Sequence, residues 1–111
     1  MFDEVFVGIP AFPNYIVSNY GRVINTTSDY ELRLTKDQNG FRRAVLYRDG
    51  RRYEFGVHRL VARAFFERWK PGVEIYHING DRNDNSVLNL TLGQMKVRGG
   101  GVDPWEDLLE D

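Results

Sequence analysis

His77 and the polar stretch after it are the residues of this chain best suited to chemistry. Five Asn or Asp side chains fall within seven residues at positions 79–85, and Asn89 follows His77 by twelve positions. A neutral imidazole, with an ordinary pKa of about 6.5, can accept a proton from water at working pH. Carbonyl and carboxylate oxygens are the ligands that hard divalent cations prefer. These residue types are able to serve in general-base chemistry or to bind a metal ion.

The histidine loop (residues 78–85) has two other interpretations, a calcium site and a purely structural loop. A calcium loop of the EF-hand type requires a central glycine and a closing glutamate. Here Gly80 comes too early and no Glu closes the loop, so we reject that interpretation. A structural loop held by Asx turns is the simpler explanation of the composition taken alone, and it stays open at this point.

The second histidine, His58, has a different setting. It lies between a β-prone run and an apolar helical pattern, in Val57-His58-Arg59-Leu60. The setting favours a packed or helix-capping histidine over a catalytic one.

A β-hairpin over residues 41–57 is the clearest element predicted ahead of the histidine loop. Asp49-Gly50 between two β-prone runs is typical of a type I′ turn. A two-residue turn places Leu46 opposite Tyr53 and Ala44 opposite Phe55, which gives the hairpin one apolar face. The other face then presents arginines to solvent or to a ligand.

The remaining elements follow from periodicity and turn signals. Apolar residues recur every four positions and predict an amphipathic helix over residues 59–69, ended by Pro71-Gly72. Strands at 15–18 and 22–24 flank an Asn-Tyr-Gly turn. A strand at 73–78, a helical turn at 86–89 and a strand at 90–92 bracket the histidine loop. Three glycines at 99–101 precede a short helix predicted to begin at Asp103.

Composition narrows the classes of protein. The chain has 111 residues and 12.9 kDa, one domain's worth, and its lack of cysteine excludes disulfides, Cys-ligated zinc and thiol catalysis. No apolar run approaches the roughly 20 residues of a membrane span, and no signal peptide pattern precedes the charged start. We therefore expect a soluble, cytoplasmic protein with no membrane partner.

The net charge of −1 is the sum of a basic segment and an acidic one. The segment 103–111 holds five acids and no base, whereas residues 1–102 hold 15 basic and 11 acidic groups. Between Arg22 and Lys70 the count is 12 basic to 6 acidic. A basic body with an acidic tail is compatible with nucleic acid, although a solvated surface explains so modest an excess equally well.

Three motifs together resemble one family. Tyr76-His77-Ile78-Asn79-Gly80-Asp81, followed by Asn83, Asn85 and Asn89-Leu90, resembles the core of HNH endonucleases of the phage homing type. Residues 57–65 resemble the His-Arg-Leu-Val-Ala helix that precedes this core, and residues 15–23 are similar to the NUMOD4 motif found N-terminal to it. Three motifs in the family's order, over roughly residues 5–92, make the match specific.

The resemblance implies a fold and a site. The fold would be α+β, with a small hairpin-rich N-terminal part followed by a ββα-metal core. Residues 1–102 would form a single domain (NUMOD4-like at about 5–56, HNH-like at 57–92), followed by the acidic tail 103–111. His77 would be the general base of a DNA endonuclease, and Asn89 would brace the loop and the geometry of the histidine. A magnesium or manganese ion would bind the scissile phosphate and stabilise the departing oxygen.

The chain departs from the family's pattern at both usual metal-ligand positions. The residue before the catalytic histidine is normally Asp or Asn, and here it is Tyr76, a poor ligand for magnesium. The last ligand, an Asn or His, normally lies on a helix after the second strand, and residues 94–101 contain neither, nor any acid. Asp81 and Asp84 are weak substitutes, so the metal ligands stay unassigned.

For contacts with DNA we expect arginines of the turn, the hairpin and the helix: Arg22, Arg43, Arg48, Arg51, Arg52, Arg59 and Arg63. Three functions stay open. The first is a metal-dependent nuclease, phage-encoded and acting in a bacterial host cell. The second is a descendant that binds DNA or regulates a partner without cutting. The third is an interaction protein that binds a protein partner through its acidic tail, where Trp105, Leu108 and Leu109 form an apolar stripe.

Overall fold

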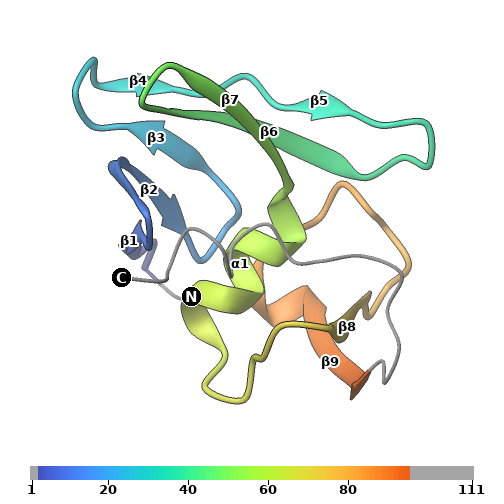
Figure 1. Ribbon diagram of the computed structural model, residues 1–111. Coiled ribbons are helices and arrows are strands. Elements are labelled where there is room, and N and C mark those ends of the chain that lie inside the picture. Colours follow the sequence, from blue (N-terminus) through green and yellow to red (C-terminus); the bar gives the residue numbers. More distant parts are fainter. Residues whose placement is uncertain (1–2, 96–111) are drawn as a thin grey trace.

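The computed structural model describes residues 3–95, in which three small antiparallel sheets surround the helix α1 (Figure 1). The elements in chain order are β1 (Phe6–Ile9), β2 (Phe12–Ser18), β3 (Val23–Asn25), β4 (Tyr30–Glu31), β5 (Thr35–Lys36), β6 (Arg42–Arg48), β7 (Arg51–Gly56), α1 (Val57–Phe65), β8 (Val73–His77), the 3₁₀ turn η1 (Val87–Asn89) and β9 (Leu90–Met95). This arrangement confirms the predicted α+β class. The predictions for the glycines at 99–101, the C-terminal helix, the acidic tail and the last metal-ligand position lie outside the described residues.

The hairpin β6–β7 has the predicted turn and register. Asp49 (φ 53°) and Gly50 (φ 79°) both take the left-handed conformation that a type I′ turn requires. The observed pairs Leu46↔Tyr53 and Ala44↔Phe55 confirm the predicted apolar face. The short strand β5 pairs with β6, while β1 to β4 form a separate sheet. The N-terminal part therefore consists of two small sheets. In the second sheet, the turn at residues 37–41 joins β5 to β6.

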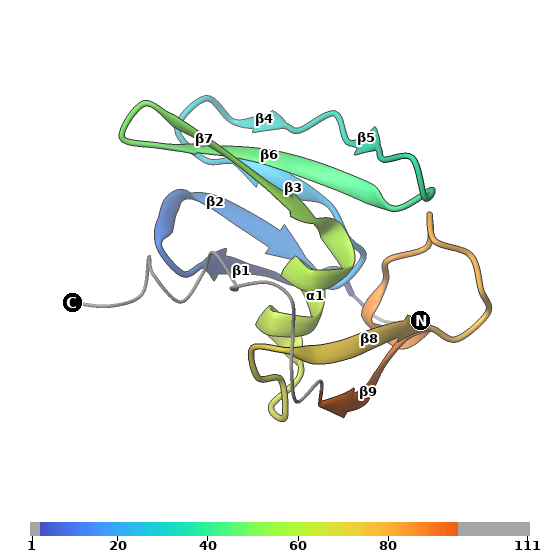
Figure 2. The ribbon, with the colours of Figure 1, turned by 45° about the vertical axis from the view of Figure 1, so that its right-hand side comes forward.

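The helix α1 lies between the N-terminal sheets and the hairpin β8–β9. It contacts β1, β2, β6 and β7 on one side and β8, β9 and η1 on the other (Figure 2). Val57, Leu60 and Val61 are buried at this junction in the same apolar cluster as Val17 and Leu46 of the sheets. One cluster of buried side chains thus spans both parts of the described chain.

The predicted end of this helix was wrong by four residues. The periodicity extends to Trp69, but α1 ends at Phe65 and Phe66 is extended (φ −101°, ψ 121°). Phe66 packs against the core in this conformation, and Trp69 turns back so that its ring lies 4.5 Å from the Arg63 guanidinium. Packing of the aromatic residues therefore overrides a local pattern that continues for one more turn.

The strands β8 and β9 present the histidine loop at one end of their hairpin. His77 is the last residue of β8 and pairs with Leu90, the first residue of β9. The N-terminal part supports the segment between them, because Val87 N–H donates to the Asn19 carbonyl at 2.8 Å. Gly21 (φ 88°) also closes on this segment, since a Cβ at that position would lie 3.2 Å from Cβ of Asn85. The Asn-Tyr-Gly turn recognised in the sequence thus positions the histidine loop.

None of the helices in the described part of the chain has the length and apolar character needed to cross a membrane.

Candidate active site

The imidazole of His77 is held by an amide of its own loop. Nε2 of His77 lies 2.7 Å from Oδ1 of Asn85, which is 5% exposed. The Asn85 amide is oriented by its other end, where Nδ2 donates to the Arg82 carbonyl at 3.5 Å. An amide oxygen can only accept, so Nε2 of His77 carries the proton in this arrangement. The lone pair is then on Nδ1, which makes no hydrogen bond within residues 3–95 and is the nitrogen able to take a proton from water.

Asn89 holds the backbone of the loop and does not hydrogen-bond to the His77 side chain. Its Nδ2 donates to Oδ1 of Asn79 and to the Asp84 carbonyl, both at 2.9 Å, and its Oδ1 accepts from Asn79 N–H at 3.1 Å. The Asn89 carbonyl also accepts from Ile78 N–H at 2.7 Å. Asn89 therefore ties both ends of the histidine loop to β9.

We expect Asn89→Ala to lower the free energy of unfolding by about 3 kcal/mol. The substitution removes three hydrogen bonds, each worth about 0.5–1.5 kcal/mol, and leaves buried polar groups unpaired. Urea unfolding followed by circular dichroism measures this change. Asn83→Ala is the matched control, because Asn83 is exposed on the same loop and its side chain makes no hydrogen bond within residues 3–95; it should change stability by less than about 0.5 kcal/mol. Equal losses in the two variants would contradict the bracing role.

Tyr76, at the position where the family carries a metal ligand, has a partner of its own. The side chain is 51% exposed, and its hydroxyl donates to Oε1 of Glu74 on the same face of β8. This hydrogen bond raises the pKa of Tyr76 above its ordinary value of 10, so the phenol is neutral at working pH. The ring lies directly over Gly93 of the neighbouring strand, where a Cβ would meet Cε2 of Tyr76 at 2.2 Å. A large neutral ring thus occupies the place of an Asp or Asn ligand.

The described residues do not fit a complete metal site. Among residues 3–95, no three His, Cys, Asp or Glu side chains are grouped so that they could hold a metal ion. The weak candidates Asp81 and Asp84 both accept hydrogen bonds inside the loop: Asp81 from Asn83 N–H at 2.9 Å, and Asp84 from the Ser86 hydroxyl at 3.0 Å. Asx turns of this kind match the structural interpretation of the loop composition.

His58 is packed beside His77, as the sequence favoured. The two imidazole centroids are 5.4 Å apart, and Phe41 stacks on His58 at 5.0 Å with an interplanar angle of 28°. Nδ1 of His58 is buried and has no hydrogen-bond partner within the described residues. Burial lowers the pKa of His58 to about 4, and the nearby basic groups act in the same direction. His58 is therefore a neutral packing group at working pH.

The side chain of Arg22 is paired with two acids. Its Nη1 lies 2.6 Å from Oε1 of Glu4, and its Nη2 lies 3.1 Å from Oε1 of Glu31. Hydrogen bonds to Glu31 and Glu4 raise the pKa of Arg22 above its ordinary value. A phosphate would have to compete with both carboxylates for this guanidinium.

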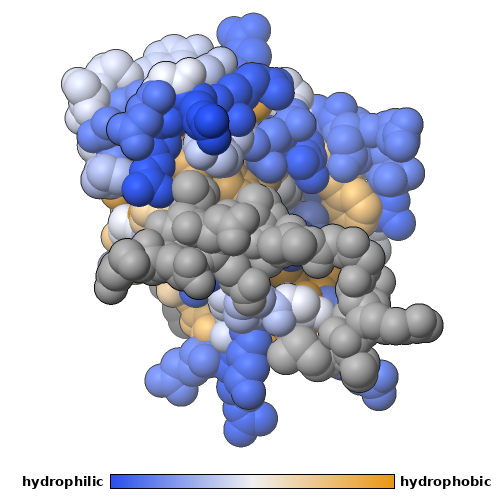
Figure 3. Space-filling view, viewed as in Figure 1, coloured by the Kyte–Doolittle hydropathy of each residue, from blue (hydrophilic) through white to orange (hydrophobic). Residues whose placement is uncertain are grey.

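The arginines of the hairpin β6–β7 are more loosely paired. Arg43 and Arg52 share the Glu54 carboxylate at 3.8 Å, and Arg48 lies 3.7 Å from Asp49. Exposed pairs at such distances contribute little to stability and leave the guanidinium groups accessible to an anion. Hydrophilic side chains cover the end of the molecule at which these strands lie (Figure 3).

The other predicted DNA contacts separate into two cases. Arg51 and Arg59 are exposed and form no ion pair within residues 3–95. Arg63 is half-buried and lies over the ring of Trp69. Of the seven arginines, those of the hairpin and Arg59 are thus better placed for an anion than Arg22 and Arg63.

Comparison with known proteins identifies the family. Residues 55–97 match the family model described as HNH endonuclease, and residues 4–47 match the NUMOD4 motif. The chain belongs to the HNH endonuclease family. The recognised motifs at His77, in α1 and around the Asn-Tyr-Gly turn fall inside these two matches, and enzymes of the family are in general metal-dependent.

Two of the relatives are phage HNH endonucleases. The DNA endonuclease I-HmuI of Bacillus phage SP01 is 33% identical over 84 residues, which cover 76% of this chain and 48% of I-HmuI. The H-N-H endonuclease F-TflII of Escherichia phage T5 is 32% identical over 94 residues, which cover 85% of this chain and 47% of F-TflII. The chain thus spans about half the length of these two relatives.

A solved structure of an HNH homing endonuclease has the same fold. The structure titled "DNA binding and cleavage by the HNH homing endonuclease I-HmuI" superposes with a TM-score of 0.76 at 31% identity. The superposition covers 80% of this chain and 52% of the other. The superposition supports the fold described above for this chain.

Sequence reasoning gave no role to three residues around His77. The partner of the imidazole is Asn85, whereas the sequence favoured Asn89 as the residue that braces the histidine geometry. Phe41 and Arg82 also lie beside the site, with the Arg82 guanidinium 4.4 Å from the centroid of the Phe41 ring. Asn85 belongs to the recognised motif and could have been singled out there, but the sequence contained no signal for the contact between Phe41 and the histidines.

Proposed function

We propose that this chain is a DNA endonuclease in which His77 is the general base for hydrolysis of a phosphodiester bond. The observation that carries the proposal is the hydrogen bond from Nε2 of His77 to the oriented amide of Asn85, which leaves Nδ1 as the accepting nitrogen. In the proposed reaction Nδ1 takes a proton from water as the water oxygen attacks phosphorus. The phosphorus–oxygen bond to the leaving group then breaks, and the departing oxygen gains a proton from solvent.

The proposed reaction uses a divalent metal ion as its cofactor. Magnesium or manganese is the expected ion, and residues 3–95 do not supply a complete ligand set for it. Because two of the relatives are phage proteins, the proposed place of action is the cytoplasm of a bacterial host.

Nicking of supercoiled plasmid tests the proposal. The protein is incubated with plasmid and magnesium or manganese, with and without chelator, and binding to the same DNA is measured by mobility shift. We expect metal-dependent conversion to the nicked form that the chelator abolishes. Intact binding without nicking under either metal would rule out the endonuclease.

Two observations favour a second candidate, a DNA-binding relative that no longer cuts. Tyr76, hydrogen-bonded to Glu74, stands where the family carries an Asp or Asn ligand, and the described residues contain no group of three His, Cys, Asp or Glu side chains that could hold a metal ion. Intact binding without nicking in the plasmid experiment is the outcome that this candidate predicts.

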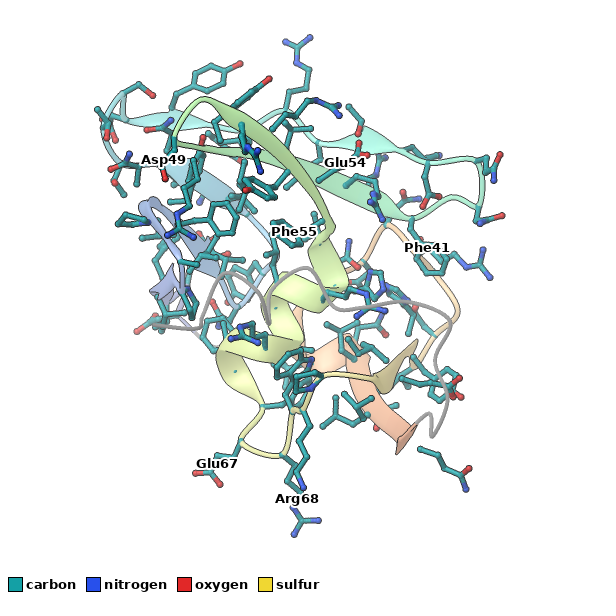
Figure 4. The ribbon with its side chains drawn as sticks, in the orientation of Figure 1. Phe41, Asp49, Glu54, Phe55, Glu67 and Arg68 are labelled. Carbon is teal, nitrogen blue, oxygen red and sulfur yellow. The ribbon has the colours of Figure 1, made fainter. Side chains whose placement is uncertain are left out.

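The proposed DNA surface consists of the arginines of the hairpin β6–β7, which are Arg43, Arg48, Arg51 and Arg52. We expect Arg51→Glu combined with Arg52→Glu to weaken binding and to reduce the slope of log K against log salt by about 0.9 for each phosphate that the variant no longer neutralises. Fluorescence anisotropy across a salt series measures both effects. The matched control is the double reversal Arg68→Glu with Lys70→Glu; Arg68 lies at the opposite end of the molecule from Asp49 of the hairpin turn (Figure 4). Equal effects of the two double reversals would contradict this assignment.

A further inference from the structure

Three aromatic rings meet where the N-terminal part approaches the candidate base. The ring of Phe41 lies 5.0 Å from that of His58 and 6.0 Å from that of His77, and the two imidazoles are 5.4 Å apart. Phe41 comes from the turn at residues 37–41, which we call the arm turn, far in sequence from His77. Figure 4 shows Phe41 at the end of β6 nearest to the histidine loop. The imidazole of the candidate base thus faces a side chain from outside the HNH-like segment.

A second connection joins the arm turn to the same imidazole. Arg82, on the histidine loop, places its guanidinium 4.4 Å from the Phe41 centroid and donates a hydrogen bond to the Asn39 carbonyl. The carbonyl of Arg82 accepts from Asn85, whose Oδ1 binds Nε2 of His77. The arm turn therefore reaches His77 by ring contact and also through Arg82 and Asn85.

The arm turn is itself well ordered by hydrogen bonds. Oδ1 of Asp37 accepts from Asn39 N–H at 2.8 Å and from Phe41 N–H at 3.0 Å, and Asp37 N–H donates to the Phe41 carbonyl at 2.9 Å. Gly40 supplies the left-handed conformation (φ 87°) that the turn needs. Phe41 is thus presented to the histidines from a closed turn with few alternative conformations.

His58 packs against Phe41 beside His77. Its ring covers the backbone of Gly56, where a Cβ would lie 2.7 Å from Cε1 of His58. Phe41 therefore rests on an imidazole that is itself fixed against β7 and α1. The Phe41 ring held in this way is tilted by 40° from the plane of the His77 imidazole and limits how far that imidazole can rotate.

We propose that Phe41 is a positioning residue for His77, so that the arm turn of the NUMOD4-like part is a working component of the nuclease site. The inference rests on the proposed role of His77 as general base. A base is effective only when its lone pair points at the attacking water, and a misplacement of about 1 Å can cost roughly a hundredfold in rate. Phe41 fixes the plane of the imidazole, and Asn85 fixes its rotation within that plane.

The test combines a measurement without DNA with one on DNA. The chain has two histidines, so ¹⁵N-histidine labelling gives two imidazole spin systems, from which NMR determines the tautomer of each ring. In the wild type we expect the Nε2–H tautomer at His77. Phe41→Leu keeps apolar bulk but removes the flat face, so we expect it to mix the His77 tautomers. It should also lower the single-turnover nicking rate about 10- to 100-fold at an unchanged half-saturating protein concentration.

Conservative and control variants separate positioning from folding. Phe41→Tyr retains the ring and should keep the wild-type tautomer and a nicking rate within about threefold of wild type. Tyr30→Leu replaces an exposed aromatic residue of β4 and should behave as wild type. Arg82→Gln removes the contacts of the Arg82 guanidinium with Phe41 and Asn39. It should also mix the His77 tautomers, and it provides the test if Phe41→Leu fails to fold.

The outcomes for the two proposals are distinguishable. A wild-type protein that does not nick overturns the proposed function, while the NMR comparison still decides the role of Phe41. If the His77 tautomer is unchanged in Phe41→Leu and in Arg82→Gln, the positioning role is overturned whether or not the wild type nicks.

Discussion

Replacing His77 by alanine is expected to lower plasmid nicking by about 10²- to 10⁴-fold, the range typical for loss of a general base. Proton transfer to Nδ1 is the step that no neighbouring group can take over. His58 has its pKa lowered to about 4 and is packed under Phe41, and Asn85 has no basic nitrogen. Single-turnover nicking at saturating protein measures the loss, and fluorescence anisotropy should show DNA affinity within about twofold of wild type.

The control for His77→Ala must preserve the loop. His77→Gln retains a side chain that can hydrogen-bond to Asn85 but cannot act as a base near neutral pH, so it should lose as much activity as His77→Ala. Asn83→Ala, on the exposed part of the same loop, should nick at the wild-type rate. An undiminished rate in both His77 variants would assign the base to another residue or the activity to a contaminant.

The second large effect expected is a loss of stability between pH 6.5 and pH 4 that is due to His58. Burial lowers the pKa of this histidine in the folded protein to about 4, from an ordinary value of 6.5. In that window the unfolded chain binds a proton that the folded chain does not, so stability is complete above pH 6.5 and falls as pH falls. The difference of about 2.5 pH units corresponds to a loss of about 3 kcal/mol at pH 4 relative to pH 7.

The charged groups around His58 act mainly in the same direction. His77, Arg59 and Arg43 lower its pKa further, and Asp37 of the arm turn opposes them. Urea unfolding at a series of pH values measures the slope. His58→Gln removes the titrating group and should remove the contribution of about 3 kcal/mol, while His77→Gln keeps His58 and should retain most of it. A wild-type slope in His58→Gln would contradict this assignment.

Local chemistry explains which elements could be predicted. The hairpin β6–β7 is specified by two turn residues and by alternation over a few neighbours, so its register could be derived in full. The end of α1 could not, because the periodicity continues to Trp69 while the packing of Phe66 ends the helix after Phe65. The difference lies in the range of the interactions that determine each feature.

In the candidate site, too, the features set by residues close in sequence could be predicted, and those set by distant residues could not. His77 and its polar loop are recognisable because their residues are close in sequence. The partner of the imidazole had to be chosen among several loop asparagines, and only the three-dimensional arrangement selects Asn85. Phe41 lies in the turn that joins β5 to β6, and no local signal connects it to His77.

The contact between the Asn-Tyr-Gly turn and the segment that follows the histidine loop limits how the two halves can be exchanged. Val87 N–H bonds to the Asn19 carbonyl, and Gly21 leaves room for Asn85 against the turn. A chimera that joins this HNH-like half to the N-terminal half of another protein would have to reproduce both contacts to keep the asparagine behind the base in place. The two halves are therefore better regarded as one unit of inheritance than as interchangeable parts.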